Sequence, residues 1–396
     1  MAIERQTPDP AQEVEEFQDM STDQSTDDID SEIIEILEGL DEEGVQYQED
    51  GSVILGDLDE DMGDVGFGEN LAEVVEDSEI NKIYIELTAA IENDKSARED
   101  WEKTYTDGLK YLGMKFDNNR SEPFEGASGV IHPLLGESVT QFQAQAYKEL
   151  LPAGGPVKTQ VVGEYSPVVE EQAQRVREFM NYQIMHVMEE YDEDLDQMLF
   201  YLPLAGSAFK KVYYDENLQR AVSKFVAPED LIVPYYTTDL DSCPRITHLI
   251  KMPENEVKKL QAIGFYRDVK VDGGNNLVGN TGLDSELEKL EGVEPSYDTG
   301  EVCHLYEVHC NLDLDGFEDT NEEGEFTEVK LPYIVTIDTN SENILSIRRN
   351  FEEDDPMKKK IAYFVHFKFL PGLGFYGFGL THMIGGLSKA STSIVR

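Results

Sequence analysis

Residues 207–226, SAFKKVYYDENLQRAVSKFV, mark the point at which the hydrophobic period of this chain changes. Apolar and polar side chains alternate over 209–214 and again over 218–225, and the polar turn 215–217 separates the two runs. A period of two around a short polar turn is typical of a β-hairpin. The sequence before the hairpin has a helical period and the sequence after it has a strand period, so we expect an α+β fold.

Three helices are predicted before the hairpin. Apolar residues recur near the helical period from Ile80 to about residue 112, and a second helix begins at Pro133 and ends near Leu151. A third helix is capped by Ser166-Pro167. Its apolar residues fall along one side, which we expect to be part of the core: Val169, Ala173, Val176, Met180, Ile184, Val187 and Tyr191.

Strands dominate after the hairpin. Prolines bound the segment 228–236, which predicts a short edge strand or an extended loop, and 253–263 predicts a helix ended by Gly264. A Gly/Asn-rich connection with at most one short helix, 284–290, follows. Further strands are expected at about 301–312, 326–338, 343–349 and 361–370, joined by acidic turns. Consecutive strands with short turns predict an antiparallel meander.

The predicted organisation has three parts: an acidic arm over 1–79, an α+β domain over 80–370, and a Gly-rich turn with the beginning of a helix over 371–396. The last residues, LTHMIGGLSKASTSIVR, have helical character without a C-cap, so we expect the chain to be cut inside a helix. Residues 1–80 of the chain hold 28 Asp or Glu and one basic residue, and a short docking helix is expected within the arm at about 31–40.

Composition excludes several classes of protein. The 396 residues are 40% hydrophobic, enough for a real core, and the formal net charge is −50. So few basic residues cannot neutralise many phosphates, which argues against a sequence-reading DNA-binding protein. Three cysteines make no disulfide framework and suit a reducing compartment. A signal peptide and a run of about 18 apolar residues are both lacking, so secretion by a signal peptide and membrane insertion are not expected.

One motif resembles a dinucleotide fingerprint. Gly372, Gly374 and Gly377 in GLGFYG satisfy the pattern G-x-G-x-x-G between a strand and a predicted helix. The strand belongs to an antiparallel region, however, and no Asp or Glu follows the motif to bind a ribose. We therefore favour a turn in which the backbone changes direction, and nucleotide binding stays as an alternative.

Metal sites are not predicted. The stretch CHLYEVHC contains zinc-ligand types, but strand alternation places Cys303 and His309 on one face and His304 and Cys310 on the other. The acidic run starting at Asp57 resembles the beginning of a calcium loop, but Met62 occupies the position that requires glycine.

Catalytic motifs are not predicted either. Ser128 lies four residues before His132, without the strand and spacing of a nucleophile elbow, and no phosphate-binding loop of the Walker type occurs. The residues thus assign no catalytic, cofactor-binding or metal residue and argue against an enzyme.

Five segments, in this order, resemble portal proteins of tailed bacteriophages, the head-to-tail connectors, of the short-tailed-phage type. They are FEGASGVIHPLLGESVTQFQAQAYKELLP (124–152), VEEQAQRVREFMNYQI (169–184), LPLAGSAFKKVYYD (202–215), VAPEDLIVPYYTTDLDSCPRITH (226–248) and FLPGLGFYGFGLTHMIGGLSKA (369–390). The likeness covers about 115–396 and includes no catalytic signature.

The resemblance implies a structural function without a cofactor. Residues 80–370 would form the wing domain of a ring subunit, and 380–396 would begin the stem helix. Portals of this family form rings, typically of twelve subunits, at one capsid vertex. The large terminase subunit pumps double-stranded DNA through the ring, major capsid and scaffold proteins surround it, and neck and tail adaptor proteins follow. The implied location is the virion, after assembly in the host bacterial cytoplasm, with no membrane. The DNA-channel residues stay unassigned.

Two alternatives remain open. Another virion or scaffold structural protein could have a similar α+β domain, and the motif at Gly372, Gly374 and Gly377 could bind a nucleotide. The long acidic arm is a departure from the family and has no assigned role.

Overall fold

The computed structural model describes residues 45–47, 53–55, 66–113, 129–215, 218–271, 283, 286–287, 290, 302–320, 326–327 and 329–396. The chain divides into two compact units, Met1–Asp64 and Val65–Arg396. In the first unit, β1 (Val45–Tyr47) pairs antiparallel with β2 (Val53–Leu55), so one apolar island of the predicted arm forms a strand. The predicted docking helix at 31–40 and the acidic run at 57–61 lie outside the described residues.

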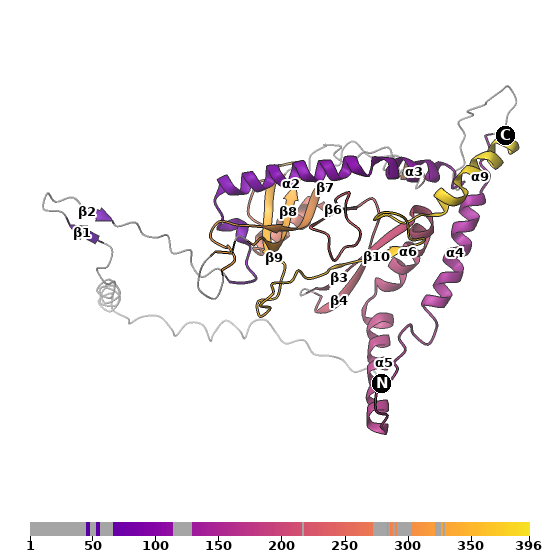
Figure 1. Cartoon of the computed structure of the whole chain (residues 1–396), viewed down its shortest axis with the longest axis horizontal. Helices are drawn as coiled ribbons and strands as arrows, with labels where there is room; N and C mark the ends of the chain where they lie inside the picture. Colours follow the sequence, from indigo (N-terminus) through magenta and orange to yellow (C-terminus); the bar gives the residue numbers. More distant parts are fainter. Residues whose placement is uncertain are drawn as a thin grey trace, which may run out of the picture. The chain divides into compact units, whose positions relative to one another are not determined.

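The second unit contains two antiparallel sheets, so the predicted α+β class is confirmed (Figure 1). The smaller sheet has the order β10-β3-β4, from β3 (Ser207–Asp215), β4 (Arg220–Val226) and β10 (Phe364–Lys368). The larger has the order β5-β6-β7-β8-β9, from β5 (Leu231–Ile232), β6 (Arg245–Pro253), β7 (Val302–Leu312), β8 (Leu331–Asp338) and β9 (Asn343–Arg349). Strands β7, β8 and β9 are three strands of the predicted meander, and β6, which the sequence analysis did not predict, pairs with β7 ahead of them.

One strand prediction is confirmed and another needs correction. The segment 228–236 contributes the two-residue strand β5 at the edge of the larger sheet, the short edge strand that its flanking prolines predicted. The last predicted strand, 361–370, is shorter and does not extend the meander: β10 pairs with β3, about 150 residues earlier in the chain. Alternation alone does not reveal such a long-range partner.

Helices cover the sheets and join them. The long helical pattern from Ile80 forms two helices, α2 (Asp77–Ala97) and α3 (Glu99–Lys110), because Arg98, with φ −99° and ψ 4°, leaves the helical conformation between them. The side chain of Arg98 donates to the carbonyl oxygens of Leu231 (2.9 Å) and Glu229 (2.6 Å), which ties this break to β5. Helix α4 (Leu134–Leu150) begins after Pro133, as predicted, and α7 (Glu254–Ala262) precedes the left-handed Gly264.

The third predicted helix is divided. Helix α5 (Pro167–Tyr182) begins at the predicted cap, where the Ser166 hydroxyl accepts from the Val169 amide. A π-helical turn, η2 (Gln183–Val187), ends it, and a separate helix, α6 (Tyr191–Ala205), leads into β3. Helix α9 (Leu380–Val395) closes the described chain. None of the helices among the described residues is long and apolar enough to cross a membrane.

The main core lies between α2 and one face of the larger sheet. Ile80, Ile83, Leu87 and Ile91 of α2 pack on buried residues of β7, β8 and β9. The short helix η1 (Leu71–Glu73) belongs to the same core, since Leu71 and Ala72 are fully buried. The compact body therefore begins before residue 80, the boundary that the sequence predicted.

Candidate functional site

The glycine motif forms a closed loop rather than a phosphate cradle. An antiparallel bridge joins Leu370 to Phe378, and the Phe378 amide donates to the Leu370 carbonyl (2.8 Å). The preceding strand, β10, lies at the edge of an antiparallel sheet and not in a parallel βαβ unit. The Gly377 amide donates to the Ser207 hydroxyl (2.8 Å), so this N–H group is not available to bind a phosphate.

Two of the glycines in this region allow close backbone packing. A Cβ atom on Gly377 would lie 2.3 Å from the Gly206 carbonyl oxygen, and one on Gly379 would lie 2.5 Å from the Leu204 carbonyl oxygen. Gly206 itself has a left-handed φ of 87°. The start of α9 is thus packed directly on the junction between α6 and β3. This geometry supports the turn that the sequence favoured.

Strand β7 separates the zinc-ligand types as predicted. Cys303 packs in the core beside α7, whereas Cys310 packs in the core under α2, so the two thiols lie on opposite faces of the sheet. Burial raises the pKa of the Cys310 thiol to about 12, which keeps it protonated at neutral pH. Among the described residues, no group of three or more His, Cys, Asp or Glu side chains is arranged to hold a metal ion.

A buried ion cluster joins the two sheets, and the sequence analysis missed it. The Lys211 ammonium of β3 lies 2.6 Å from both carboxylate oxygens of Glu307 on β7, and His309 Nε2 lies 2.8 Å from Glu307 Oε1. Burial alone would raise the pKa of Glu307, but the nearby Lys211 and His309 outweigh it and hold this pKa below its ordinary value. The cluster therefore holds a charged carboxylate between the sheets.

Two further histidines, His248 and His366, are half-buried and stay neutral at neutral pH. Burial lowers the pKa of His248, the cross-strand partner of Glu307, to about 4. Burial, and next the charge of Lys368, lowers the pKa of His366 to about 3. The His366 ring contacts the rings of Phe209 and Phe375, with each centroid 4.5 Å away, and these two phenylalanine rings also stack on each other. Both imidazole rings are therefore uncharged at neutral pH and contribute to packing.

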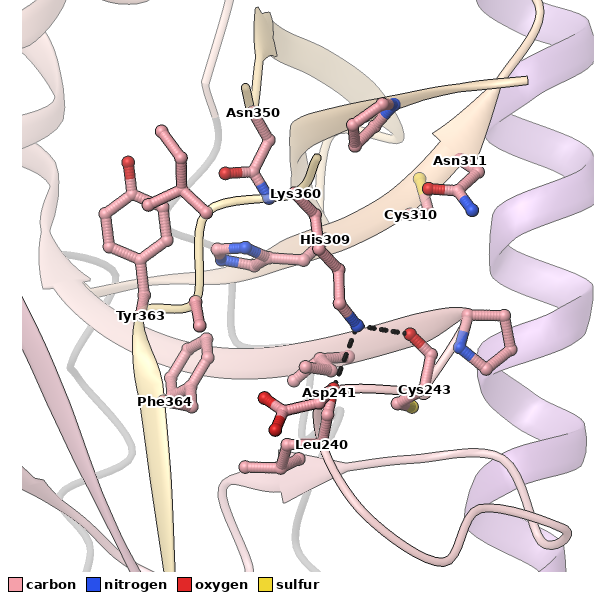
Figure 2. Close-up of a pocket in the computed structure, with 15 residues that line it drawn as sticks. Leu240, Asp241, Cys243, His309, Cys310, Asn311, Asn350, Lys360, Tyr363 and Phe364 are labelled. Carbon is pink, nitrogen blue, oxygen red and sulfur yellow. Dashed lines mark hydrogen bonds between the residues drawn. The ribbon is translucent and has the colours of Figure 1, made fainter. Parts of the chain in front are cut away.

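A small enclosed pocket lies next to His309 (Figure 2). The Lys360 ammonium donates to the carbonyl oxygens of Leu240 (2.9 Å) and Cys243 (2.8 Å), the contacts drawn as dashed lines in Figure 2. The pocket volume is about 20 Å³, which has room for roughly one water molecule. It is too small for a substrate, and Lys360 anchors the loop 240–243 to the segment before β10.

Of the pair Ser128 and His132, Ser128 lies outside the described residues and His132 lies within them. The His132 backbone amide donates to the Thr392 hydroxyl of α9 (3.1 Å). His132 thus contributes to packing around α9.

Helix α5 presents an apolar face to solvent. Figure 1 shows it projecting away from both sheets, and it contains no buried residue. Val169, Val176 and Met180 are 38%, 51% and 45% exposed. These three residues and Ala173 form one face, here named the α5 stripe. The sequence analysis expected this face to be part of the core, and that prediction is wrong for the single chain.

Helix α9 also presents an apolar face to solvent, and its side chains are more exposed than those of the α5 stripe. Its buried residues are Thr381, Ser388 and Thr392, which are small and polar. Its outward face contains Met383, Leu387 and Ile394, at 59%, 61% and 86% exposure, together with exposed Ala390. These four residues are named the α9 stripe. Leu380 and Ile384 of α9 pack on the core, but a helix that buries hydroxyls and leaves three large apolar side chains exposed is suited to be covered by another surface.

The two stripes are therefore the candidate site, an interaction surface and not a catalytic centre. The signal was present in the sequence for α5, as a helical period of apolar residues, although it was interpreted as core. No protein-family model matches this chain, and a search of curated proteins finds no significant match.

Proposed function

We propose that this chain is a structural subunit of a ring, of the kind formed by phage portal proteins, through which double-stranded DNA is packaged and ejected. The observation that carries the proposal is the pair of exposed apolar stripes on α5 and α9, two separate helices of one body. A subunit that meets identical neighbours through two different faces makes heterologous contacts, which generate a ring when the rotation between neighbours closes.

The charge of the chain suits a channel for moving DNA. A formal charge of −50 leaves few basic side chains to bind phosphates tightly, so DNA can pass without being held. The order of the five portal-like segments in the sequence supports the portal family in particular. On this proposal the location is the virion, and the partners are the large terminase subunit, major capsid and scaffold proteins, and neck or tail adaptors.

Negative-stain electron microscopy across a salt series tests the proposal. Residues 81–396 carry a formal charge of −23, so identical subunits repel one another at low ionic strength. We expect rings with a central hole wide enough for duplex DNA, with a yield that rises with salt or divalent cations. Monomers or closed dimers in every condition would argue against a ring.

Nucleotide titration supplies a second test. A Cβ atom on Gly374 meets nothing within 4 Å, so Gly374→Val leaves the loop packing intact. We expect no saturable binding of NAD or ATP by calorimetry. Micromolar binding that Gly374→Val abolishes would overturn the proposed function in favour of a nucleotide-binding protein.

A further inference from the structure

We propose that the α5 stripe of one copy packs against the α9 stripe of its neighbour. This inference rests on the proposed function, since it assumes a ring of identical subunits. It commits to one occupant for each stripe, a helix of a second copy of this chain. The argument uses the spacing of the stripes, their charge and the symmetry of a ring.

The spacings of the two stripes match. Val169, Ala173, Val176 and Met180 are separated by four, three and four residues, and Met383, Leu387, Ala390 and Ile394 have the same separations. Apolar residues that alternate three and four apart form the seam of helices that pack at a shallow angle, with knobs of one helix in holes of the other. Each stripe extends about 17 Å, at 1.5 Å per residue. Each stripe also has one alanine among larger side chains, which leaves room for a side chain of the partner helix.

The surroundings of the two stripes reduce the repulsion between copies. Helix α9 contains Lys389 and no acidic residue. Helix α5 contains Glu170, Glu171 and Glu178 against Arg175 and Arg177, so its formal charge is −1. In a chain of net charge −50, these helices are surfaces on which a second copy can approach at low Coulomb cost. The single positive charge on α9 also complements the small negative charge on α5.

The symmetry of a ring favours pairing of unlike stripes. Contact between two α5 stripes, or between two α9 stripes, is isologous and closes a dimer after one contact. Contact between the α5 stripe of one copy and the α9 stripe of the next leaves one stripe of each kind available at the ends, so addition continues until the ring closes.

Cysteine cross-linking tests this pairing in the full chain. The three native cysteines are buried, at 4%, 0% and 7% exposure, so an introduced surface cysteine is the reactive thiol. We would prepare Val176→Cys and Ala390→Cys separately, mix them under conditions in which rings form, and oxidise with copper phenanthroline. The expected product is a dimer in the mixture and no dimer with either variant alone. The double variant is expected to give a ladder of higher oligomers.

Control positions on the same helices exclude random collision. Glu171→Cys lies on the opposite side of α5 from the stripe, with its side chain 71% exposed, and Lys389→Cys lies beside the α9 stripe. Neither is expected to cross-link with its partner helix. Efficient cross-linking of Val176→Cys with itself, or of Ala390→Cys with itself, would overturn the inference.

Charge variants provide an independent test. Val176→Glu and Ala390→Lys change exposed side chains, so the circular dichroism spectrum and melting temperature of each monomer should be preserved. Val176→Glu is expected to reduce the yield of rings at least tenfold, and the double variant is expected to restore part of it. If Val176→Glu forms rings as well as the wild type does, this pairing is refuted and the proposed function stands. If the wild type itself forms no rings, the proposed function is refuted.

Discussion

Replacing Lys211 tests whether the buried ion cluster holds the two sheets together. Lys211→Met keeps much of the side-chain volume and removes the charge that lies 2.6 Å from both oxygens of Glu307. The side chains of Lys211 and Glu307 are only 17% and 15% exposed, so the remaining carboxylate is left without its main partner in a poorly solvated place. Breaking a buried pair in this way costs about 3–5 kcal/mol.

A second variant separates the loss of an attraction from the burial of a lone charge. In Lys211→Met with Glu307→Leu, neither charge remains, and replacement of a buried pair by apolar residues is often nearly neutral. We therefore expect the double variant to be more stable than Lys211→Met alone. The matched control is Lys103→Met, which removes a pair with Glu99 whose side chains are 63% and 64% exposed. Its expected cost is below about 1 kcal/mol.

Urea unfolding, followed by far-UV circular dichroism and by the fluorescence of the single tryptophan, gives these free energies. The effect should also depend on pH. The lowered pKa of Glu307 adds stability above its ordinary value of 4.5, and this stability is lost as the pH falls below that value. Protonation of Glu307 at low pH should thus narrow the difference between Lys211→Met and the wild type. A cost under 1 kcal/mol at pH 7 would refute the role of the cluster.

Three further predictions concern other parts of the core. His248 and His366 have lowered pKa values of about 4 and about 3, so below pH 6.5 the unfolded chain binds more protons than the folded one. The free energy of unfolding should therefore fall by roughly 2 kcal/mol per histidine between pH 7 and pH 5. A free energy of unfolding that does not change over this range would contradict the neutral state of both histidines. Gly377→Ala places a methyl group 2.3 Å from a backbone oxygen, so its melting temperature should fall by several degrees, corresponding to about 1–3 kcal/mol, whereas Gly374→Ala has open space and should melt like the wild type. Leu71→Ala should lower the free energy of unfolding in urea by about 2–5 kcal/mol, because this side chain is fully buried. An unchanged free energy would show that the segment around Leu71 does not belong to the core.

Local patterns in the sequence predicted most of the elements. The alternation around residues 215–217 located β3 and β4, and the separation of Cys303 from Cys310 followed from the period of two in β7. Both features depend only on neighbouring residues. By contrast, the pairing of β10 with β3 depends on residues far apart in the sequence, and no local period specifies it.

The boundary of the body was predicted too late for a physical reason. Residues 66–79 are acidic, like the arm before them, and charge dominated the prediction. Two hydrogen bonds between residues far apart in the sequence change the outcome: the Asn70 side-chain oxygen accepts from the Ile347 amide (3.0 Å), and its amide group donates to the Leu345 carbonyl (3.0 Å). Asn70 thereby covers the edge of β9, which brings Leu71 into the core.

The ion cluster shows what alternation could have revealed. Cys303 and Leu305 point into a core on the odd face of β7, and the same period assigns Glu307 and His309 to that face. An inward carboxylate needs a buried cation, but the sequence does not identify Lys211 as that partner, because it belongs to another sheet. The need for a partner was predictable, and the identity of the partner was not.

The α5 stripe is the most informative disagreement between sequence and structure. A helical period of apolar residues reports that a face is buried in the state in which the protein functions, whether its cover comes from the same chain or another one. Val176 and Met180 follow that period, yet 51% and 45% of their surface is exposed in the single chain. Because this face is largely exposed among the described residues, we propose that another molecule covers it, and the matching spacing on α9 favours a second copy of this chain as that cover.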